Sequence, residues 1–309
     1  MRKQFNLGID HFLSCLDITT DQTKYVLELA EQFKNNNNCE HILKNKVLGL
    51  IFDKASTRTR VSFQVAMSRL GGSTIDLNPN TSQIGRGEPI KDTARVLSRY
   101  CDVLAIRTYL HKDIEEYAEW STKPVINALT DLEHPCQALA DFLTIKENFG
   151  KFEDLVLTFI GDGNNVANSL ILCGSLLGLE VRIACPKSYE PNSSILDKAK
   201  SVIPCGKNIK LFNNPLDAAE GADILYTDVW SSMGEEDNSN MKEKDFNGFT
   251  VNSDLLKRAK RDSIILHCLP AYRGKEITDD VIESSKSKIF DQAENRMYVQ
   301  QALLACLLS

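Results

Sequence analysis

Hydroxyl and guanidinium side chains gather in the segment Ser56-Thr-Arg-Thr-Arg60, which follows the apolar run 47–51. A helical pattern begins there and ends at Gly71-Gly72, so the segment lies where a strand passes into a helix. The first amides of a helix have no partner within it and the helix dipole is positive there, so such a junction binds phosphate well. The alternative is an ordinary helix N-cap beside surface charge. The side chains that would add donors to a bound anion are Ser56, Thr57, Arg58 and Thr59.

Further polar clusters follow other predicted strands. Open α/β sheets bind their ligands beyond the carboxyl ends of the strands, so clusters at these positions favour a binding site. Taken singly, each has an ordinary explanation, such as a surface arginine, a histidine before a helix or a small buried cysteine. The clusters are Arg107-Thr108, His134-Pro-Cys-Gln137, Asp228 with Ser232-Met233-Gly234, His267-Cys-Leu-Pro270, and Arg296 after Ala293-Glu294-Asn295.

The turn Gly161-Asp-Gly-Asn-Asn165 invites comparison with a dinucleotide-binding fingerprint, because a strand precedes it and a helix follows. Val166 stands in place of the third glycine, and the next strand ends in Cys185-Pro186 without an acidic residue to bind a ribose. The sequence therefore disfavours an NAD-dependent oxidoreductase, and no cofactor is predicted. The asparagine side chains are predicted to bind a polar ligand instead.

Short β-rich runs alternate with longer amphipathic runs along the chain. This order predicts an α/β fold of two doubly wound parallel-sheet lobes. A helix over 135–149 starts with proline and ends before Gly150, so we expect it to join the lobes, with the active-site cleft beside it. The predicted strands cover 47–52, 74–77, 103–106 and 125–127 in the first lobe, and 155–160, 181–185, 209–212, 224–227 and 264–267 in the second.

Two domains are expected from the length of 309 residues, since single cores stop growing at roughly 250 to 300 residues. We place the first domain at 1–149 and the second at 150–293. The segment 294–309 is strongly apolar at helical spacing and is predicted to pack on a lobe.

Composition narrows the class of protein. A formal net charge of -6 and scattered basic residues argue against nucleic acid or an anionic membrane as the main partner. Nine cysteines without a C-x-x-C pair indicate reduced thiols of a cytoplasmic enzyme, and neither a structural zinc site nor another metal site is predicted. No apolar run approaches the roughly 20 residues of a membrane-spanning helix.

Together the motifs resemble the aspartate/ornithine carbamoyltransferase family. The Ser56 segment, His134-Pro-Cys-Gln137 and the Arg296 segment match its carbamoyl-phosphate signature. The turn at Gly161, the Asp228-to-Gly234 segment and His267-Cys-Leu-Pro270 are similar to its ornithine branch, and the similarity extends from His11 to Met297.

The loop 81–88 separates the two branches of the family. The aspartate branch typically carries a lysine there, whereas this chain reads Thr81-Ser-Gln-Ile-Gly-Arg-Gly-Glu88. Arg86 is a departure, because it can supply the charge that the lysine would have supplied, and this puts the contact assigned to Gln83 in question. The ornithine branch remains the better match.

The resemblance implies carbamoyl transfer from carbamoyl phosphate to the side-chain amine of L-ornithine, giving L-citrulline and phosphate in arginine biosynthesis or catabolism. It also implies that the first domain binds carbamoyl phosphate, the second binds ornithine, and the C-terminal helix returns to the first. The family's catalytic unit is a homotrimer, so a trimer or a multiple of trimers is expected. Alternatives are a carbamoyltransferase for aspartate, putrescine or an acylated ornithine, and a catalytically silent relative.

The resemblance also implies roles for the polar residues. Phosphate would be held by Ser56, Thr57 and Arg58 with help from Gln83, while Arg60 would brace the loop through an acidic partner. Thr59, Arg107 and His134 would donate to the carbonyl oxygen, Arg296 would complete the anion pocket, and Gln137 and the Leu269 carbonyl would bind the carbamoyl NH2. Asp228 would bind the α-ammonium of ornithine, and Asn165, Ser232 and Met233 its α-carboxylate. Cys268 would lie near the attacking nitrogen, either accepting a proton or orienting the amine.

Overall fold

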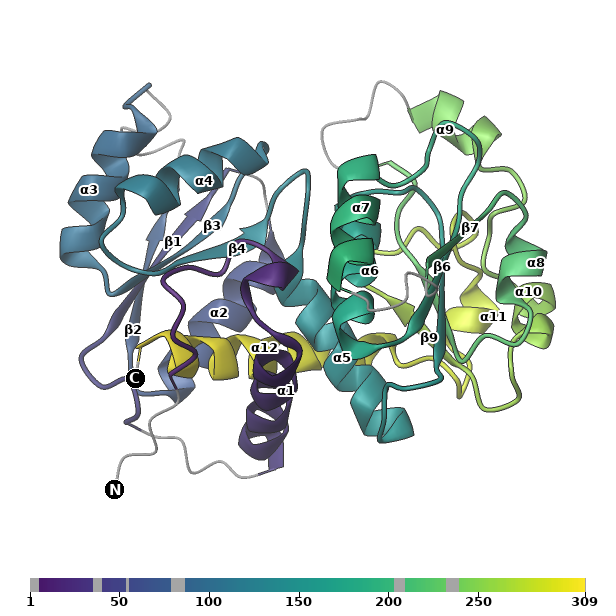
Figure 1. Cartoon of the computed structure of the whole chain (residues 1–309), viewed down its shortest axis with the longest axis horizontal. Helices are drawn as coiled ribbons and strands as arrows, with labels where there is room; N and C mark the ends of the chain where they lie inside the picture. The colour runs from purple at the N-terminus through teal and green to yellow at the C-terminus, as the bar shows by residue number, and fades with distance from the viewer. Residues whose placement is uncertain are drawn as a thin grey trace. The chain divides into compact units, whose positions relative to one another are not determined.

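The computed structural model of the chain describes residues 6–35, 41–53, 56–78, 87–202, 209–231 and 239–308 (Figure 1). It divides into two compact units, Met1–Leu143 with Glu294–Ser309, and Thr144–Ala293. Each unit has one parallel sheet covered by helices, so the predicted α/β fold with two parallel sheets is confirmed. No helix within the described ranges has the length and apolar character needed to cross a bilayer.

The sheet of unit 1 has the strand order β2-β1-β3-β4. The chain passes from β1 outward to β2 and then returns past β1 to β3, so the strand order reverses between β1 and β3. The strands are β1 (Val47–Phe52), β2 (Ser73–Leu77), β3 (Val103–Arg107) and β4 (Val125–Leu129). Its helices are η1 (Cys15–Asp17), α1 (Thr20–Asn35), α2 (Thr57–Arg69), α3 (Ile90–Tyr100) and α4 (His111–Trp120).

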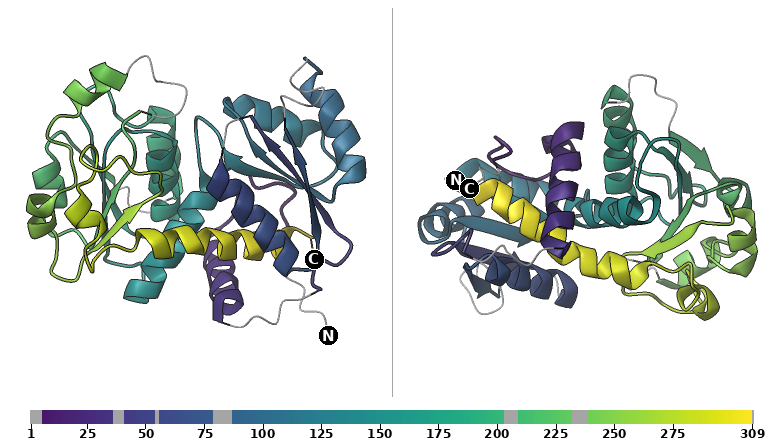
Figure 2. Two further views of the ribbon diagram at one scale, coloured as in Figure 1. Left: turned by 180° about the vertical axis from the view of Figure 1, so that it is seen from behind. Right: turned by 90° about the horizontal axis from the view of Figure 1, so that it is seen from below.

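Helices cover both faces of this sheet. Figure 2 shows α2 on one face, and α3 and α4 lie together on the other. Alternate side chains of the strands point to opposite faces, so Ile51, Leu104 and Ile106 meet Ile114 and Tyr117 of α4 in one apolar cluster. All five side chains are buried, and this packing fixes the positions at which β1 and β3 end.

The sheet of unit 2 has the strand order β7-β6-β5-β8-β9, and here the order reverses between β5 and β8. The strands are β5 (Val156–Ile160), β6 (Glu180–Ala184), β7 (Ile209–Phe212), β8 (Ile224–Thr227) and β9 (Ile264–His267). The helices are α6 (Asn165–Leu177), α7 (Ser193–Val202), α8 (Pro215–Ala219), α9 (Ser239–Asp245), α10 (Ser253–Arg258) and α11 (Asp279–Ile282). One large apolar cluster packs Ile160, Leu225 and Ile265 against Phe246 and Val281.

Two helices contain the points at which the chain changes unit. α5 (Pro135–Phe149) contains the division between Leu143 and Thr144, and α12 (Ile289–Leu308) contains the division between Ala293 and Glu294. The part of α12 within unit 1 is almost fully buried, which explains the apolar spacing in its sequence.

Candidate active site

The reversal of strand order in unit 1 brings the segment after β1 beside the end of β3. Phe52 pairs with Arg107 in the sheet, and α2 begins a few residues later with Ser56 at its N-cap. The Ser56 hydroxyl does not cap the helix; it accepts a hydrogen bond from Arg107 Nη1 at 3.3 Å. The first turn of α2 contains no acidic residue to compensate its positive end. Helix amides and arginine therefore converge where an anion would bind.

Thr59 and Arg296 connect the beginning of α2 with α12. Arg296 Nη2 donates to Thr59 Oγ1 at 2.6 Å, although the two residues are 237 positions apart in the sequence. Both side chains are buried. In the same turn Thr57 is exposed and Arg58 partly exposed, so these two side chains face solvent.

Arg60 has a structural role. Its guanidinium forms an ion pair with Asp76 of β2 and lies 4.9 Å from the centre of the Phe52 ring. The prediction that Arg60 braces this loop through an acidic partner is confirmed.

His134 is held in place from the N-terminal segment. The neighbouring Glu133 accepts hydrogen bonds from Ser14 Oγ at 2.6 Å and from the Cys15 amide at 3.0 Å, and burial raises the pKa of its carboxyl group. The His134 carbonyl accepts the first backbone hydrogen bond of α5, from the Gln137 amide at 3.0 Å. The histidine is thereby fixed between β4 and α5.

His134 is an uncharged hydrogen-bonding group. Burial lowers its pKa well below 6.5, and the positive charges of Arg296 and Arg107 lower it further. A neutral imidazole carries one N–H donor, so it can polarise a carbonyl oxygen without transferring a proton.

Gln137 lies on the first turn of α5 and is buried. Its Nε2 donates to Asp141 Oδ1 at 2.7 Å, whereas its Oε1 accepts no hydrogen bond from the described residues. Because a buried amide oxygen needs a donor, Oε1 is suited to accept one from a ligand NH2 group.

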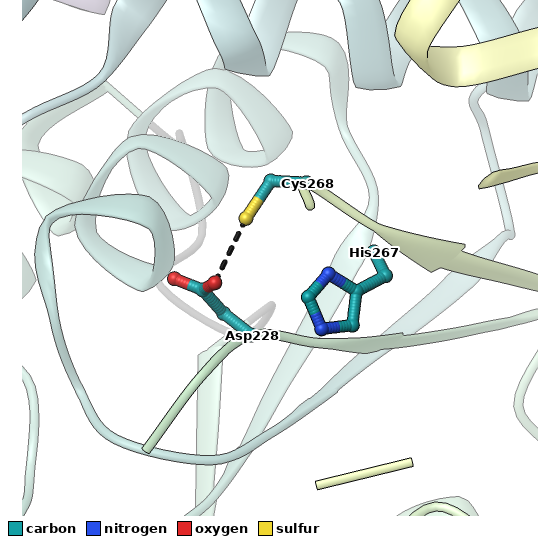
Figure 3. A group of neighbouring side chains, drawn as sticks. All are labelled: Asp228, His267 and Cys268. Carbon is teal, nitrogen blue, oxygen red and sulfur yellow. Dashed lines mark hydrogen bonds between the residues drawn. The ribbon is translucent and has the colours of Figure 1, made fainter. Parts of the chain in front are cut away.

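Asp228 and Cys268 come together at the reversal in unit 2. They follow the neighbouring strands β8 and β9, and Cys268 Sγ donates to Asp228 Oδ1 at 2.9 Å (Figure 3). Asp228 is buried and Cys268 is partly exposed, so the thiol is the more accessible of the two.

Asn164 belongs to the predicted asparagine turn, but the sequence reasoning missed its contact with Asp228. Its Oδ1 accepts from the amides of Val166 and Ala167 at 2.9 and 3.1 Å and caps α6, while its Nδ2 donates to Asp228 Oδ2 at 3.0 Å. Asn165, which we had named, is the first residue of α6 and is partly buried. An asparagine directly before a helix is a common N-cap, and this signal could have identified Asn164.

Gly163 is a glycine for a packing reason. A Cβ atom at this position would lie 2.3 Å from Pro191 N and 2.6 Å from the Glu190 carbonyl carbon. The loop 189–191 therefore packs directly on the turn, and close approach to a pyrophosphate is not needed to explain the glycine.

Asp228, His267 and Cys268 also offer atoms close enough to share a metal ion, within 4.8 Å of one another. His267 Nδ1 accepts from the Leu269 amide at 2.8 Å, and Nε2 lies 3.1 Å from Glu276 Oε1. Both ring nitrogens are thus engaged within the protein, so the ring is not free to act as a ligand. We assign no metal centre to this cluster.

Sequence profiles of one family cover both units. The carbamoyl-phosphate-binding domain of aspartate/ornithine carbamoyltransferases matches residues 10–147, and the Asp/Orn-binding domain matches residues 153–307. The chain belongs to the aspartate/ornithine carbamoyltransferase family. The two matched domains follow one another along the chain, as residues 10–147 and 153–307.

Individual members of the family are similar over the whole chain. A protein named ornithine carbamoyltransferase from Prochlorococcus marinus subsp. pastoris is 70% identical over 308 residues, which cover 100% of both chains. The structure of ornithine carbamoyltransferase from Pyrococcus furiosus has a TM-score of 0.94 at 46% identity and covers 98% of each chain. Anabolic ornithine carbamoyltransferase from Campylobacter jejuni has a TM-score of 0.91 at 40% identity, over 97% of this chain and 99% of that one.

The described structure places several of the residues that the family signature names in contact with one another. In unit 1, Ser56 contacts Arg107 and Thr59 contacts Arg296. The positive charges of both arginines help to lower the pKa of His134. In unit 2, Asp228 and Cys268 are in contact. Gln83, Ser232 and Met233 lie outside the described residues, so their predicted contacts stay predictions.

Proposed function

We propose that the chain is an ornithine carbamoyltransferase, which transfers the carbamoyl group of carbamoyl phosphate to the side-chain amine of L-ornithine and releases L-citrulline and phosphate. The observation that carries the proposal is the hydrogen-bonded pair of Cys268 and Asp228 at 2.9 Å, in a chain 70% identical over its whole length to a protein of that name. In this reaction a new C–N bond forms, the C–O bond to phosphate breaks, and the amine loses a proton.

Unit 1 is suited to bind carbamoyl phosphate. The phosphate dianion would bind to the first amides of α2 and to Ser56, Thr57 and Arg58, with Gln83 as a further donor. No acidic side chain in that turn repels it. The same donors stabilise the charge that grows on the phosphate as it leaves.

The carbonyl oxygen gains negative charge in the transition state, and donors already in place stabilise that charge. Thr59, Arg107 and neutral His134 fill this role, with the buried guanidinium of Arg296 beside them. Loss of one such preorganised donor raises the barrier by about 2.7 to 4 kcal/mol. The carbamoyl NH2 would donate to Gln137 Oε1.

Unit 2 is suited to bind ornithine. Each oxygen of a carboxylate can accept about two hydrogen bonds. Oδ1 of Asp228 already accepts from Cys268 Sγ and the Val229 amide, whereas Oδ2 accepts from Asn164 and can take one more donor. We assign that position to the α-ammonium of ornithine, and Asn165 with the Ser232–Met233 backbone to its α-carboxylate.

The attacking amine must be uncharged, although a free alkyl ammonium has a pKa of about 10.4. Cys268 lies beside the proposed site of the α-ammonium and is the only partly exposed cysteine of the described residues. We therefore propose that it either takes the proton of the attacking side-chain amine or orients that amine.

A Cys268→Ser substitution separates this role from binding of the first substrate. We expect kcat to fall by about ten-fold or more, because the attacking amine loses its partner, while carbamoyl phosphate affinity measured by calorimetry stays unchanged. Cys173→Ser, in α6 of the same unit, controls for loss of a buried thiol. An equal fall in both quantities would place Cys268 in the carbamoyl phosphate pocket instead.

The test of the proposed function is colorimetric detection of citrulline from purified protein with ornithine and carbamoyl phosphate. Aspartate, putrescine and N-acetylornithine serve as alternative acceptors in matched assays. Turnover with ornithine alone is the expected result, and turnover restricted to another amine would replace this function by that of the corresponding carbamoyltransferase.

Family membership and the thiols support a proposal for assembly and location. We infer a cytoplasmic homotrimer, or a multiple of trimers, that acts in arginine biosynthesis or catabolism. No disulfide joins any of the seven cysteines of the described residues, in agreement with a reducing compartment. Light scattering on the purified protein measures its mass, and a monomer would contradict the trimer.

A further inference from the structure

His111 is a partly buried histidine at the end of the sheet of unit 1, and the scheme above gives it no role. It is the first residue of α4, and 15% of its side chain is exposed. Its amide donates to Asp131 Oδ1 at 2.8 Å, and its Nδ1 lies 2.9 Å from Thr130 Oγ1. Both partners belong to the turn 130–133, which follows β4 and leads into His134. The histidine therefore bridges the segments that follow two neighbouring strands.

The Thr130 side chain closes the turn that precedes His134. Its Oγ1 accepts from the Glu133 amide at 3.3 Å, and the Thr130 amide donates to the Glu133 carbonyl at 2.9 Å. A hydroxyl group has a single hydrogen to donate, and His111 Nδ1 at 2.9 Å is a nearer acceptor than the Glu133 carbonyl at 3.4 Å. The hydroxyl hydrogen therefore points to Nδ1, and the ring proton is on Nε2, which lies 4.0 Å from Glu115 Oε1.

The register between β3 and β4 shifts at Arg107. Ile106 pairs with Asn127, but Arg107 pairs with Leu129, so β4 contains one residue more than β3 at this point. Such a bulge bends the strand and changes the direction of the side chain beside it. The pairing resumes beyond the bulge, because the Thr108 amide donates to the Leu129 carbonyl at 3.1 Å. The direction of the Arg107 side chain therefore depends on where β4 holds it.

Hydrogen bonds continue between the two segments beyond the strand ends. The Asp131 amide donates to the Tyr109 carbonyl at 2.9 Å, next to the two contacts of His111. These contacts join the segment after β3 to the segment after β4. Arg107 ends β3 and His134 follows the second segment, so a displacement of one segment against the other changes the separation of these two side chains.

We propose that His111 is a positioning residue for carbamoyl transfer, because its bridge to Thr130 fixes Arg107 and His134 relative to each other. In the proposed function these two side chains donate to the same carbonyl oxygen, so the inference rests on that function. Two donors stabilise one developing charge best when both are directed at it before the reaction begins. His111 touches no substrate in the scheme, and its effect is to set the separation and direction of the two donors.

His111→Leu and His111→Asn test the proposal as a matched pair of similar size. The Oδ1 of asparagine can replace Nδ1 as the acceptor for the Thr130 hydroxyl, whereas leucine offers no acceptor. We expect kcat of His111→Leu to fall by about ten-fold or more, since a misplacement of about 1 Å can cost a hundred-fold in rate, and His111→Asn to recover most of it. Carbamoyl phosphate affinity measured by calorimetry stays unchanged in both, because the start of α2 holds the phosphate.

The carbonyl stretching frequency of bound carbamoyl phosphate provides a measurement that does not depend on turnover. Hydrogen bonds to a carbonyl oxygen weaken the C=O bond, so infrared difference spectra with isotope-labelled carbamoyl phosphate show how well the donors are directed. We expect the shift to lower frequency on binding to be smaller by about half or more in His111→Leu and to be nearly restored in His111→Asn. A residue that only stabilised the fold would leave the frequency of the bound ligand unchanged.

Ser121→Ala is the matched control for loss of a side-chain contact. Just after the end of α4, Ser121 Oγ donates to the Lys123 carbonyl at 2.8 Å and accepts from the Lys123 amide at 3.1 Å, so it closes the turn that leads into β4. We expect a lower melting temperature in this variant, with kcat and the carbonyl frequency close to those of the original protein. If His111→Leu resembles Ser121→Ala in all three measurements, the positioning role is wrong.

Thr130→Ser and Thr130→Ala decide the matter if His111→Leu does not fold. Serine keeps the hydroxyl that donates to His111, whereas alanine removes it. The proposal expects a higher kcat and a larger carbonyl shift for Thr130→Ser than for Thr130→Ala, and equal values would overturn it.

The proposed function and the positioning role can fail separately. If the original protein makes no citrulline, the function is wrong, while the carbonyl frequency still shows whether His111 aligns the donors on bound carbamoyl phosphate. If it makes citrulline and His111→Leu keeps the original kcat and carbonyl frequency, only the positioning role is wrong.

Discussion

At the scale of single residues, the site combines side chains that carry or bind charge with neighbouring side chains that fix their positions. Burial lowers the pKa of His134 well below 6.5, and the positive charges of Arg296 and Arg107 lower it further, so the histidine is neutral. Glu133 and Asn164 do not belong to the carbamoyl-phosphate or ornithine positions that the family signature predicts. They nevertheless fix His134 and Asp228, respectively.

Arg58 is partly exposed in the first turn of α2, where its guanidinium can reach a bound phosphate. Arg58→Ala is expected to weaken carbamoyl phosphate binding by about ten- to a hundred-fold, because a hydrogen bond to a charged group contributes roughly 1.5 to 3 kcal/mol. Isothermal titration calorimetry measures the change. Arg99→Ala, an exposed arginine in α3, removes the same charge from the same unit, and an equal loss there would show that the effect is not specific to the site.

Asn164 has two functions that one substitution can separate. Aspartate is as good an N-cap as asparagine, so Asn164→Asp keeps α6 stable but places a second carboxylate beside Asp228. We expect the KM for ornithine to rise by about ten-fold or more with little change in melting temperature. Asn252→Asp is the matched control, since Asn252 caps α10 through two amides at 3.0 and 3.1 Å away from the site. A similar KM in both variants would remove Asn164 from the site.

At the scale of elements, the apolar periodicity of the sequence predicted the strands well. The observed bounds of β1, β7, β8, β9 and α5 coincide with the predicted ranges, because each is an apolar-rich run with a clear turn or cap signal. β2 to β4 extend one or two residues beyond prediction, because backbone pairing continues there, as between Phe52 and Arg107 and between Arg107 and Leu129. Strand ends are decided by neighbouring strands, which a local pattern does not contain.

The candidate site was only partly predictable. Motif residues at strand ends, such as Asp228 and Cys268, could be named because parallel strands deliver their carboxyl ends to one edge. Asn164 acts through a contact with Asp228, 64 positions further along the chain, and no spacing rule shows this contact. Whether Gln83 contributes stays a prediction, as does the domain boundary at residue 150.

Gly163 tests how tightly the turn after β5 is packed. Gly163→Ala places a methyl group against the backbone of 189–191, so we expect a loss of roughly 1 to 3 kcal/mol in unfolding free energy and a weaker affinity for ornithine. Urea denaturation and ornithine kinetics measure the two effects. Gly178→Ala, at the other end of α6, meets no atom within 4 Å and carries only the cost of its φ of +81°. If it raises the KM for ornithine equally, the packing explanation is wrong.

At the scale of the whole molecule, the same arrangement occurs twice. Each unit has a parallel sheet whose strand order reverses once, and each reversal carries polar side chains. The family matches divide along the same lines, with a carbamoyl-phosphate-binding domain and an Asp/Orn-binding domain. Two substrates of different charge can therefore be recognised by two separately folded sheets.

Neutral His134 also predicts how the stability of the molecule depends on pH. Its pKa is lower in the folded state than the usual 6.5, so the unfolded chain binds more protons between these values. Stability from this group is complete above pH 6.5 and is lost as the pH falls below that value. We expect the unfolding free energy of the original protein to fall more steeply below pH 6.5 than that of His134→Gln. Parallel curves from urea denaturation across this range would contradict the assignment.

The 2.6 Å hydrogen bond between Thr59 and Arg296 has a consequence for the order of events during synthesis. A ribosome releases Thr59 early and Arg296 near the end of translation, after all of Thr144–Ala293. Thr59 cannot form this hydrogen bond until Arg296 has been synthesised. The domain whose synthesis begins first is therefore completed last. Nascent chains arrested before codon 294 should therefore carry a second domain able to fold while the first remains incomplete and exposed to chaperones.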